Sequence, residues 1–254
     1  MRKYLIYAIG EILLVVIGIL IALKINTVNQ NQQRAKLENA LLAQLQFEIY
    51  EVYADIWRDA GVLAMGAQSH QYIQEFIKED KPYRDSLCFA FHWIKMDEYV
   101  YPTSAAYSRF KEEGLDIIKN DGIRINLQTL YEGHFPRLSK NNALMPDISN
   151  TFNDYYLNAF QPNSDLSLLF DYPLANDTVS RRIYTNVAYV FPQEGNQETI
   201  GYVPINFEAL KKDPKFLMLL DQTKRYRDNK IRHYSAVKSI IKEMMQQIDE
   251  ELGK

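Results

Sequence analysis

The pattern of apolar and polar positions divides the chain into an apolar N-terminal segment and a longer amphipathic remainder. Residues 4–23 (YLIYAIGEILLVVIGILIAL) form an almost unbroken apolar run, which Lys24 ends. Twenty helical residues span roughly 30 Å, the thickness of the hydrocarbon core of a bilayer. The run therefore predicts a membrane-spanning helix. No small-x-small cleavage site follows it, which argues against a removable signal peptide.

A second helix pattern begins directly after the apolar run. Residues 26–33 (NTVNQNQQ) contain neither glycine nor proline, so the first helix can continue through them. Apolar residues then recur three and four positions apart, the period of an amphipathic helix. They are Leu42, Leu45, Ile49, Val52 and Ile56, and Leu63 resumes the stripe after the polar Asp59. This predicts a helix over residues 29–60 or further, which Gly61 and Gly66 weaken at its far end.

Shorter helices are expected in the middle of the chain. The pattern places them at residues 83–96, 104–113, 123–132 and 142–160. Thr103 is the expected N-cap of the second of these helices, and Gly114 its C-terminal stop. Gly133 and Pro136 are expected to end the third.

Residues 161–205 depart from the helical pattern, because four prolines punctuate them. Residues 182–191 (RIYTNVAYVF) are β-prone and could pair with residues 199–203 as a short hairpin. After this insertion, Asn206 is an expected N-cap and Pro214 suits the first turn of a long helix over residues 214–252.

The last helix matches the 29–60 helix in length, so the two are expected to pack antiparallel. The residues expected to face inward are Phe216, Leu219, Leu220, Tyr226, Ile231, Tyr234, Val237, Ile241, Met244, Met245 and Ile248. The pattern as a whole predicts a mainly α fold. A transmembrane anchor (residues 1–25) continues into an elongated helical bundle (residues 26–254), with an irregular, β-prone insertion at 161–205.

One acidic residue, Glu11, lies within the apolar run. A carboxylate at membrane depth is costly and marks a candidate functional position, although it can also snorkel or pair with Arg2 or Lys3. Glu11 shares one stripe of the helix with small residues that permit close helix approach. These are Ala8, Gly18 and Ala22. The stripe predicts packing against a second transmembrane helix, from a partner protein or from a second copy of the chain.

Positive charge gives a weak indication of orientation, since the two ends of the run carry similar numbers of lysines and arginines. The very short, positive N-terminus favours a cytoplasmic N-terminus. We therefore expect a single-pass protein of the inner membrane whose bulk lies in the periplasm.

The first 26 residues also carry a family resemblance. Residues 4–26 (YLIYAIGEILLVVIGILIALKIN) closely resemble the start of a widespread family of uncharacterised Bacteroidota membrane proteins, with its Gly-Glu, its Gly-Ile-Leu-Ile-Ala-Leu and its Asn-rich turn. Residues 106–120 (AYSRFKEEGLDIIKN) are similar to a helix and turn of that family, and the long C-terminal helix also fits. The chain departs from the pattern at Lys24, where the family usually has Gln, and at Val28, where Trp is common. The resemblance implies a membrane-anchored domain and no known reaction.

Composition and motifs point away from several function classes. A net charge of −3 argues against a nucleic-acid partner, because such binding relies on neutralising phosphates. The single cysteine, Cys88, lies in an apolar segment and is expected to be a small core residue. None of the four histidines (His70, His92, His134 and His233) forms a metal-binding motif, and no nucleotide or hydrolase signature is present. We therefore expect neither a cofactor nor an enzyme.

The segment 224–233 concentrates positive charge on the last helix. Its basic residues are Lys224, Arg225, Arg227, Lys230 and Arg232. They could form a solvated helix face, or a site for an anionic ligand or a lipid headgroup.

Two functions of different class fit these observations. The first is a membrane-anchored interaction or scaffold protein, and the second is a sensor whose ligand pocket lies near the tyrosines of residues 152–190. A solid core would favour the scaffold, whereas a large apolar pocket would favour the sensor.

Overall fold

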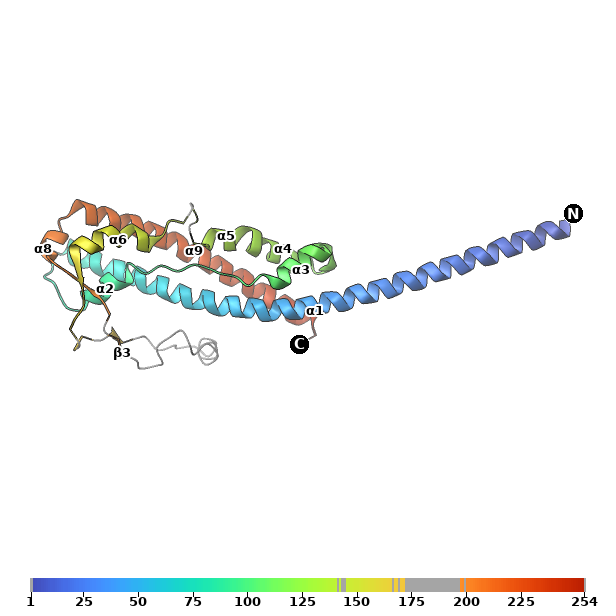
Figure 1. Cartoon of the computed structure of the whole chain (residues 1–254), viewed down its shortest axis with the longest axis horizontal. Coiled ribbons are helices and arrows are strands. Elements are labelled where there is room, and N and C mark those ends of the chain that lie inside the picture. Colours follow the sequence, from blue (N-terminus) through green and yellow to red (C-terminus); the bar gives the residue numbers. More distant parts are fainter. Residues whose placement is uncertain are drawn as a thin grey trace. The chain divides into compact units, whose positions relative to one another are not determined.

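The chain adopts a mainly α-helical fold, as its pattern predicts (Figure 1). The computed structural model describes residues 2–140, 142, 145–165, 167–168, 170–171, 197–198 and 200–253, with side chains described from Gly10 onward except at residues 170–171 and 197–198. The expected strand at residues 182–191 lies outside this description.

The N-terminal helix α1 (Arg2–Lys78) is one continuous helix. Its first part is long and apolar enough to cross a membrane: an 18-residue window has a mean hydropathy of 2.2, and none of it is buried. The helix continues past Gly61 and Gly66 to Lys78, in agreement with the predicted helix over residues 29–60 or further. A glycine costs a helix only about 1 kcal/mol, which the burial of the surrounding apolar stripe exceeds. The helix stops just before Asp80, which takes a left-handed backbone with φ of 48°.

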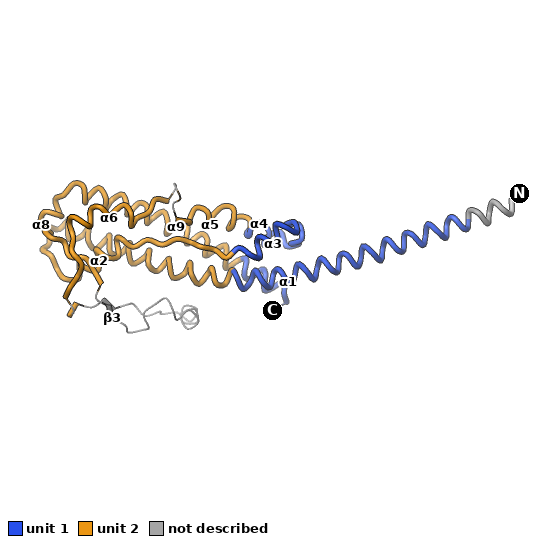
Figure 2. The backbone as a smooth tube through the Cα atoms, viewed as in Figure 1, with its two compact units in different colours: residues 1–48, 104–127, 244–254 blue, residues 49–103, 128–243 orange. Residues whose placement is uncertain are grey.

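The chain forms two compact units, which Figure 2 shows in different colours. Unit 1 comprises residues 1–48, 104–127 and 244–254, and unit 2 comprises residues 49–103 and 128–243. Both α1 and the last helix, α9 (Pro214–Glu251), contribute to each unit.

Unit 1 packs the middle of α1 against α3 (Ala105–Glu113), the 3-10 turn η1 (Leu115–Ile117), α4 (Asp121–Gln128) and the end of α9. Two buried acids of α1 hold these elements. The Glu48 carboxylate accepts hydrogen bonds from the Ala106 N–H at 3.1 and 3.2 Å, and Glu38 accepts one from the Lys119 N–H at 2.8 Å. A carboxylate at a helix N-terminus satisfies N–H groups that lack partners within the helix.

This arrangement corrects the expected N-cap of α3. The helix begins one residue later than predicted, with Ser104 at the cap position and no side-chain hydrogen bond from it. Glu48, which is distant in sequence, takes the role that was expected of Thr103. Gly114 ends the helix as predicted, with φ of 89°.

In unit 2, α1 and α9 run antiparallel, as predicted (Figure 1). Tyr53 of α1 lies beside Lys242 of α9, Asp59 beside Tyr234, and His70 beside Thr223, so the partners follow in reverse order. Ile49 and Ile241, which we expected inside, are both fully buried.

The rest of unit 2 packs an aromatic core against this helix pair. Its elements are α2 (Leu87–Trp93), α6 (Ile148–Ala159), β1 (Phe160–Pro162), β4 (Tyr202–Pro204) and α8 (Phe207–Leu210). Asn206 caps α8, as predicted, by accepting a hydrogen bond from the Ala209 N–H.

The described strands form two small antiparallel pairs. β4 pairs with β1, whose first residue, Phe160, was expected to be the last of the 142–160 helix. β2 (Phe170–Asp171) pairs with β3 (Gln197–Glu198). The strand that we expected to begin at residue 199 thus has β1 as its partner. β1 directly follows α6, whose aromatic side chains pack against it.

The predicted stops at Gly133 and Pro136 are wrong. After α4, the chain continues as a π-helical turn η2 (Thr129–His134) and a short helix α5 (Phe135–Leu138). Pro136 falls in the first turn of α5, where a missing N–H costs no hydrogen bond.

Candidate interaction face and buried polar seam

The predicted helix-packing residues lie on an uncovered stretch of α1. Glu11, Gly18 and Ala22 are all exposed, and a Cβ added to Gly18 would meet no atom within 4 Å. At 100° per residue, Gly18 and Ala22 lie within about 20° of Glu11 around the helix axis. Ala8 precedes the described side chains. The contact of this stripe with a second helix stays a prediction.

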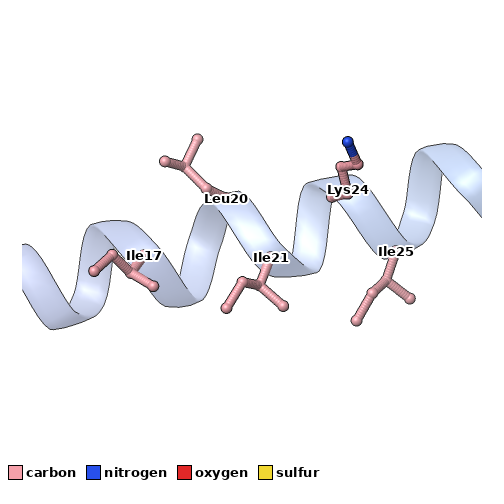
Figure 3. A pocket seen from close by; sticks show the side chains of 5 residues that line it. All are labelled: Ile17, Leu20, Ile21, Lys24 and Ile25. Carbon is pink, nitrogen blue, oxygen red and sulfur yellow. The ribbon is translucent and has the colours of Figure 1, made fainter.

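A shallow hollow lies on the same stretch of α1, between Ile17, Leu20, Ile21, Lys24 and Ile25. Figure 3 shows that all five side chains project from this one helix, with Leu20 and Lys24 on one edge and the three isoleucines on the other. The hollow is therefore a groove between side-chain ridges of a single helix.

The basic segment of α9 is divided by the structure. Three of its side chains face outward, and each has a partner on its own helix. Lys224 pairs with Asp228 at 2.7 Å, Arg225 pairs with Asp221 at 2.6 Å, and Arg232 donates a hydrogen bond to the Asn229 side chain at 3.4 Å. Arg227 and Lys230 are buried. The five basic side chains do not share one surface.

Arg227 is fully buried and binds backbone oxygens. Its Nη2 donates hydrogen bonds to the carbonyls of Ile94 at 2.8 Å and Met96 at 2.9 Å, just beyond the C-terminal end of α2. Burial lowers its pKa to about 10, so the guanidinium remains charged at neutral pH. Gly66 of α1 leaves room for it, since a Cβ there would lie 2.1 Å from Arg227 Nη1.

Lys230 forms a buried ion pair with Asp97. The Lys230 Nζ lies 2.6 Å from Asp97 Oδ1, and neither side chain is more than 1% exposed. Asp97 also accepts hydrogen bonds from the Tyr99 hydroxyl at 2.9 Å and the Ile148 N–H at 2.8 Å, which fixes the start of α6. Burial lowers the pKa of Lys230, and the Asp97 charge acts in the opposite direction.

Asp59 is a buried acid without a strong cationic partner. Its carboxylate accepts a hydrogen bond from the Tyr234 hydroxyl at 3.3 Å, and Arg58 Nε lies 3.6 Å away. Burial and, to a lesser extent, the negative charge of Glu98 raise its pKa to about 7. Asp59 therefore changes charge near neutral pH.

His70 is a buried, neutral histidine. Burial, followed by the charge of Arg227, lowers its pKa to about 4. Its Nδ1 lies 2.9 Å from the Gly66 carbonyl, which can only accept, so this nitrogen carries the hydrogen. Its Nε2 lies 3.1 Å from the Thr223 hydroxyl on α9, which also lies 2.7 Å from the Leu219 carbonyl.

Together these residues form a polar seam between α1 and α9 of unit 2. The polar seam consists of Asp59 and His70 from α1, and Thr223, Arg227, Lys230 and Tyr234 from α9. The spacing of the α9 members is four, three and four residues, which continues the apolar stripe from Leu220 to Ile241. A search for apolar residues alone misses these polar members of the stripe. Tyr226 and Ile231, which we predicted to face inward, are only half-buried.

The seam supplies a register for the helix pair. Two contacts join the helices directly, between Tyr234 and Asp59 and between Thr223 and His70. Arg227 and Lys230 of α9 bind the segment after α2 instead, through the Ile94 and Met96 carbonyls and the Asp97 carboxylate. A slip of α1 by one turn against α9 would break both direct contacts and leave the buried Asp59 and His70 without these partners.

Two features bear on other chemistry. Cys88 is fully buried, as predicted, and burial raises the pKa of its thiol to about 11, so it is a poor nucleophile. His134 and His233 lie together, with ring centroids 6.1 Å apart. Within the described residues, no group of three or more His, Cys, Asp or Glu side chains is placed to hold a metal ion.

No protein-family model, curated protein or solved structure matches this chain.

Proposed function

We propose that the chain is a membrane-anchored interaction or scaffold protein of the cell envelope. The N-terminal segment crosses the inner membrane once, with the N-terminus in the cytoplasm, and the helical bulk stands in the periplasm. The family resemblance of residues 4–26 supports such an anchored domain.

The carrying observation is the continuity of α1. An apolar stretch with no buried residue in its 18-residue window runs without a break into the helix that forms the core of the folded units. A rigid helix transmits position and force between the membrane and the domain better than a flexible tether. Contacts of Asp59 with Tyr234 and of His70 with Thr223 would help to hold α1 in place against α9 within unit 2.

The packing of the described aromatic residues favours the scaffold over the sensor. Near the predicted ligand pocket, Tyr156 stacks on Phe160 with centroids 4.2 Å apart, and Tyr155 stacks on Phe216 at 5.6 Å. These rings pack against one another in the core, and residues 172–190 of the predicted pocket region lie outside the described residues.

The test is crosslinking of the full-length protein in its native membranes, with protease treatment of intact spheroplasts. We expect the protein to remain in the membrane fraction, its bulk to be cleaved from outside, and one defined crosslinked species to form. Intact-mass measurement should find the span still attached. A mature protein that starts near residue 24 to 30, or an absence of any specific crosslink, would overturn the proposal.

A further inference from the structure

One line of exposed residues follows α1 from the apolar span to the part of the helix that packs against α3 and α4 in unit 1. We call it the outer face of α1 and define it by Glu11, Gly18, Ala22, Ile25, Lys36 and Phe47, all of which are exposed. At 100° per residue they lie within about 40° of one line along the helix, and Phe47 lies on the line of Glu11 itself.

Unit 1 covers a different side of α1. The buried α1 residues in this unit are Glu38, Leu41, Leu42, Leu45 and Glu48. Phe47 sits among them in sequence and is 68% exposed, while Ile25 is 64% exposed. Single exposed apolar residues are common. Phe47 and Ile25 stand out because they lie on the same side of α1 as the Glu11 carboxyl group.

The two charged residues of the outer face, Glu11 and Lys36, differ from Arg34 and Glu38 on the same helix. Arg34 pairs with Asp116, and Glu38 pairs with Lys119. Among the described side chains, Glu11 and Lys36 form no hydrogen bond or ion pair. They lie about 37 Å apart along the helix, one within the apolar run and one above it.

We infer that the outer face binds the transmembrane helix of a different membrane protein. That helix continues into water, and it carries a basic side chain level with Glu11 and an acidic side chain level with Lys36. The inference rests on the proposed function and names the chemistry of the partner.

Charge complementarity selects this partner over a second copy. Copies in one membrane share an orientation, so a symmetric pair would place Glu11 against Glu11 and Lys36 against Lys36. Like charges in an interface oppose association, and an acid at membrane depth is stabilised by a polar or basic neighbour. The small residues Gly18 and Ala22 allow any helix to come close, so the charges decide which one does.

A charge-swapped copy of the chain provides the probe. Full-length wild-type protein and the Glu11→Lys/Lys36→Glu variant are labelled at the C-terminus with donor and acceptor fluorophores and reconstituted into phosphatidylcholine vesicles. We expect the mixed pair to associate about tenfold more strongly than either protein with itself. Gly18→Leu and Phe47→Ala should weaken the mixed pair.

Lys24→Glu is the matched control, because Lys24 lies about 140° from Glu11 around α1 and so outside the outer face. It should leave wild-type pairing unchanged. Lys36→Glu alone changes only the aqueous part and should still pair with wild type better than wild type pairs with itself. Because Lys36→Glu alone keeps Glu11, it still tests the inference if Glu11→Lys prevents insertion into the membrane.

Three results would overturn the inference: self-association of wild type as strong as the mixed pair, a mixed pair no stronger than wild type alone, or an equal gain from Lys24→Glu. The first of these leaves the proposed scaffold function intact, since it makes the partner a second copy. The proposed function fails separately, in the native-membrane crosslinking.

Discussion

Apolar side chains are usually buried and charged ones exposed, and both halves of α1 depart from this rule. In the N-terminal half, isoleucines and leucines are exposed, for example Ile25 at 64%. In the half that belongs to unit 2, the charged Asp59 is 3% exposed and His70 is fully buried. The same helix thus presents apolar groups outward at one end and encloses polar groups at the other.

The contrast shows that burial must be interpreted together with the solvent. Apolar side chains are stable on an outer surface where the surroundings are lipid, whereas buried charges need partners inside the protein. Each region can be tested by substitution: the buried region by removing the partner of a buried charge, and the exposed region by removing an exposed apolar side chain.

The largest effect is expected from breaking the buried ion pair. Lys230→Ala leaves Asp97 buried without its cation, so we expect the free energy of unfolding to fall by about 3–5 kcal/mol. Urea unfolding of the full-length protein in detergent micelles measures the change. Lys224→Ala removes an exposed ion pair on the same helix and should cost less than about 0.5 kcal/mol. Equal losses from both variants would show that burial does not separate them.

The next effect concerns the space for Arg227. Gly66→Ala places a methyl group where the guanidinium lies, so we expect a loss of about 1–3 kcal/mol in the free energy of unfolding. In a double-mutant cycle with Arg227→Met, the loss from Gly66→Ala should shrink, because the group that it strikes is gone. Additive losses would contradict this contact. Gly61→Ala, where a Cβ meets nothing within 4 Å, is the matched control and should not destabilise.

The sequence predicted the architecture better than it predicted the seam. Apolar periodicity gave both long helices, their antiparallel pairing and the burial of Ile49 and Ile241, because burial of an amphipathic stripe dominates helix stability. It missed Arg227 and Lys230 as core residues, since charged residues are rarely buried unless they are paired. Their partners, Asp97 and the carbonyls of Ile94 and Met96, are more than 130 residues away in sequence.

Helix caps were predictable only where the capping residue is adjacent in sequence to the helix that it caps. Asn206 caps its own helix, and Gly114 ends one. The cap of α3 comes from Glu48, 58 residues from the N–H that it binds, and no local motif could have identified it. The Gly133 and Pro136 stops failed for a related reason, since helical turns can restart where tertiary contacts hold them.

A smaller effect is expected from pH. Asp59 has a pKa of about 7 in the fold against 3.8 unfolded. Its protonated form therefore stabilises the protein below pH 3.8, and that stability is lost as the pH rises through 7. His70 acts in the opposite sense, because its pKa falls from 6.5 to about 4 on folding and acid must charge it.

Comparison with Asp59→Asn isolates the Asp59 contribution, since His70 is common to both proteins. Between pH 8 and pH 6, the wild type should gain about 1 kcal/mol of stability relative to Asp59→Asn. Urea unfolding at the two pH values measures this difference. A difference that does not change with pH would mean that Asp59 does not titrate in this range.

The smallest effect on stability is expected from the outer face of α1. Phe47 and Ile49 are two residues apart on α1, yet Phe47 is 68% exposed and Ile49 is fully buried. Ile49→Ala should cost about 2–5 kcal/mol in the free energy of unfolding, because it leaves a cavity in the core. Phe47→Ala should cost less than about 0.5 kcal/mol, since its ring has little to lose in the isolated chain. If the outer face binds a partner helix, Phe47→Ala should nevertheless reduce crosslinking in native membranes while leaving the urea midpoint unchanged. A loss of stability comparable to that of Ile49→Ala would show that Phe47 belongs to the core and would remove it from the face.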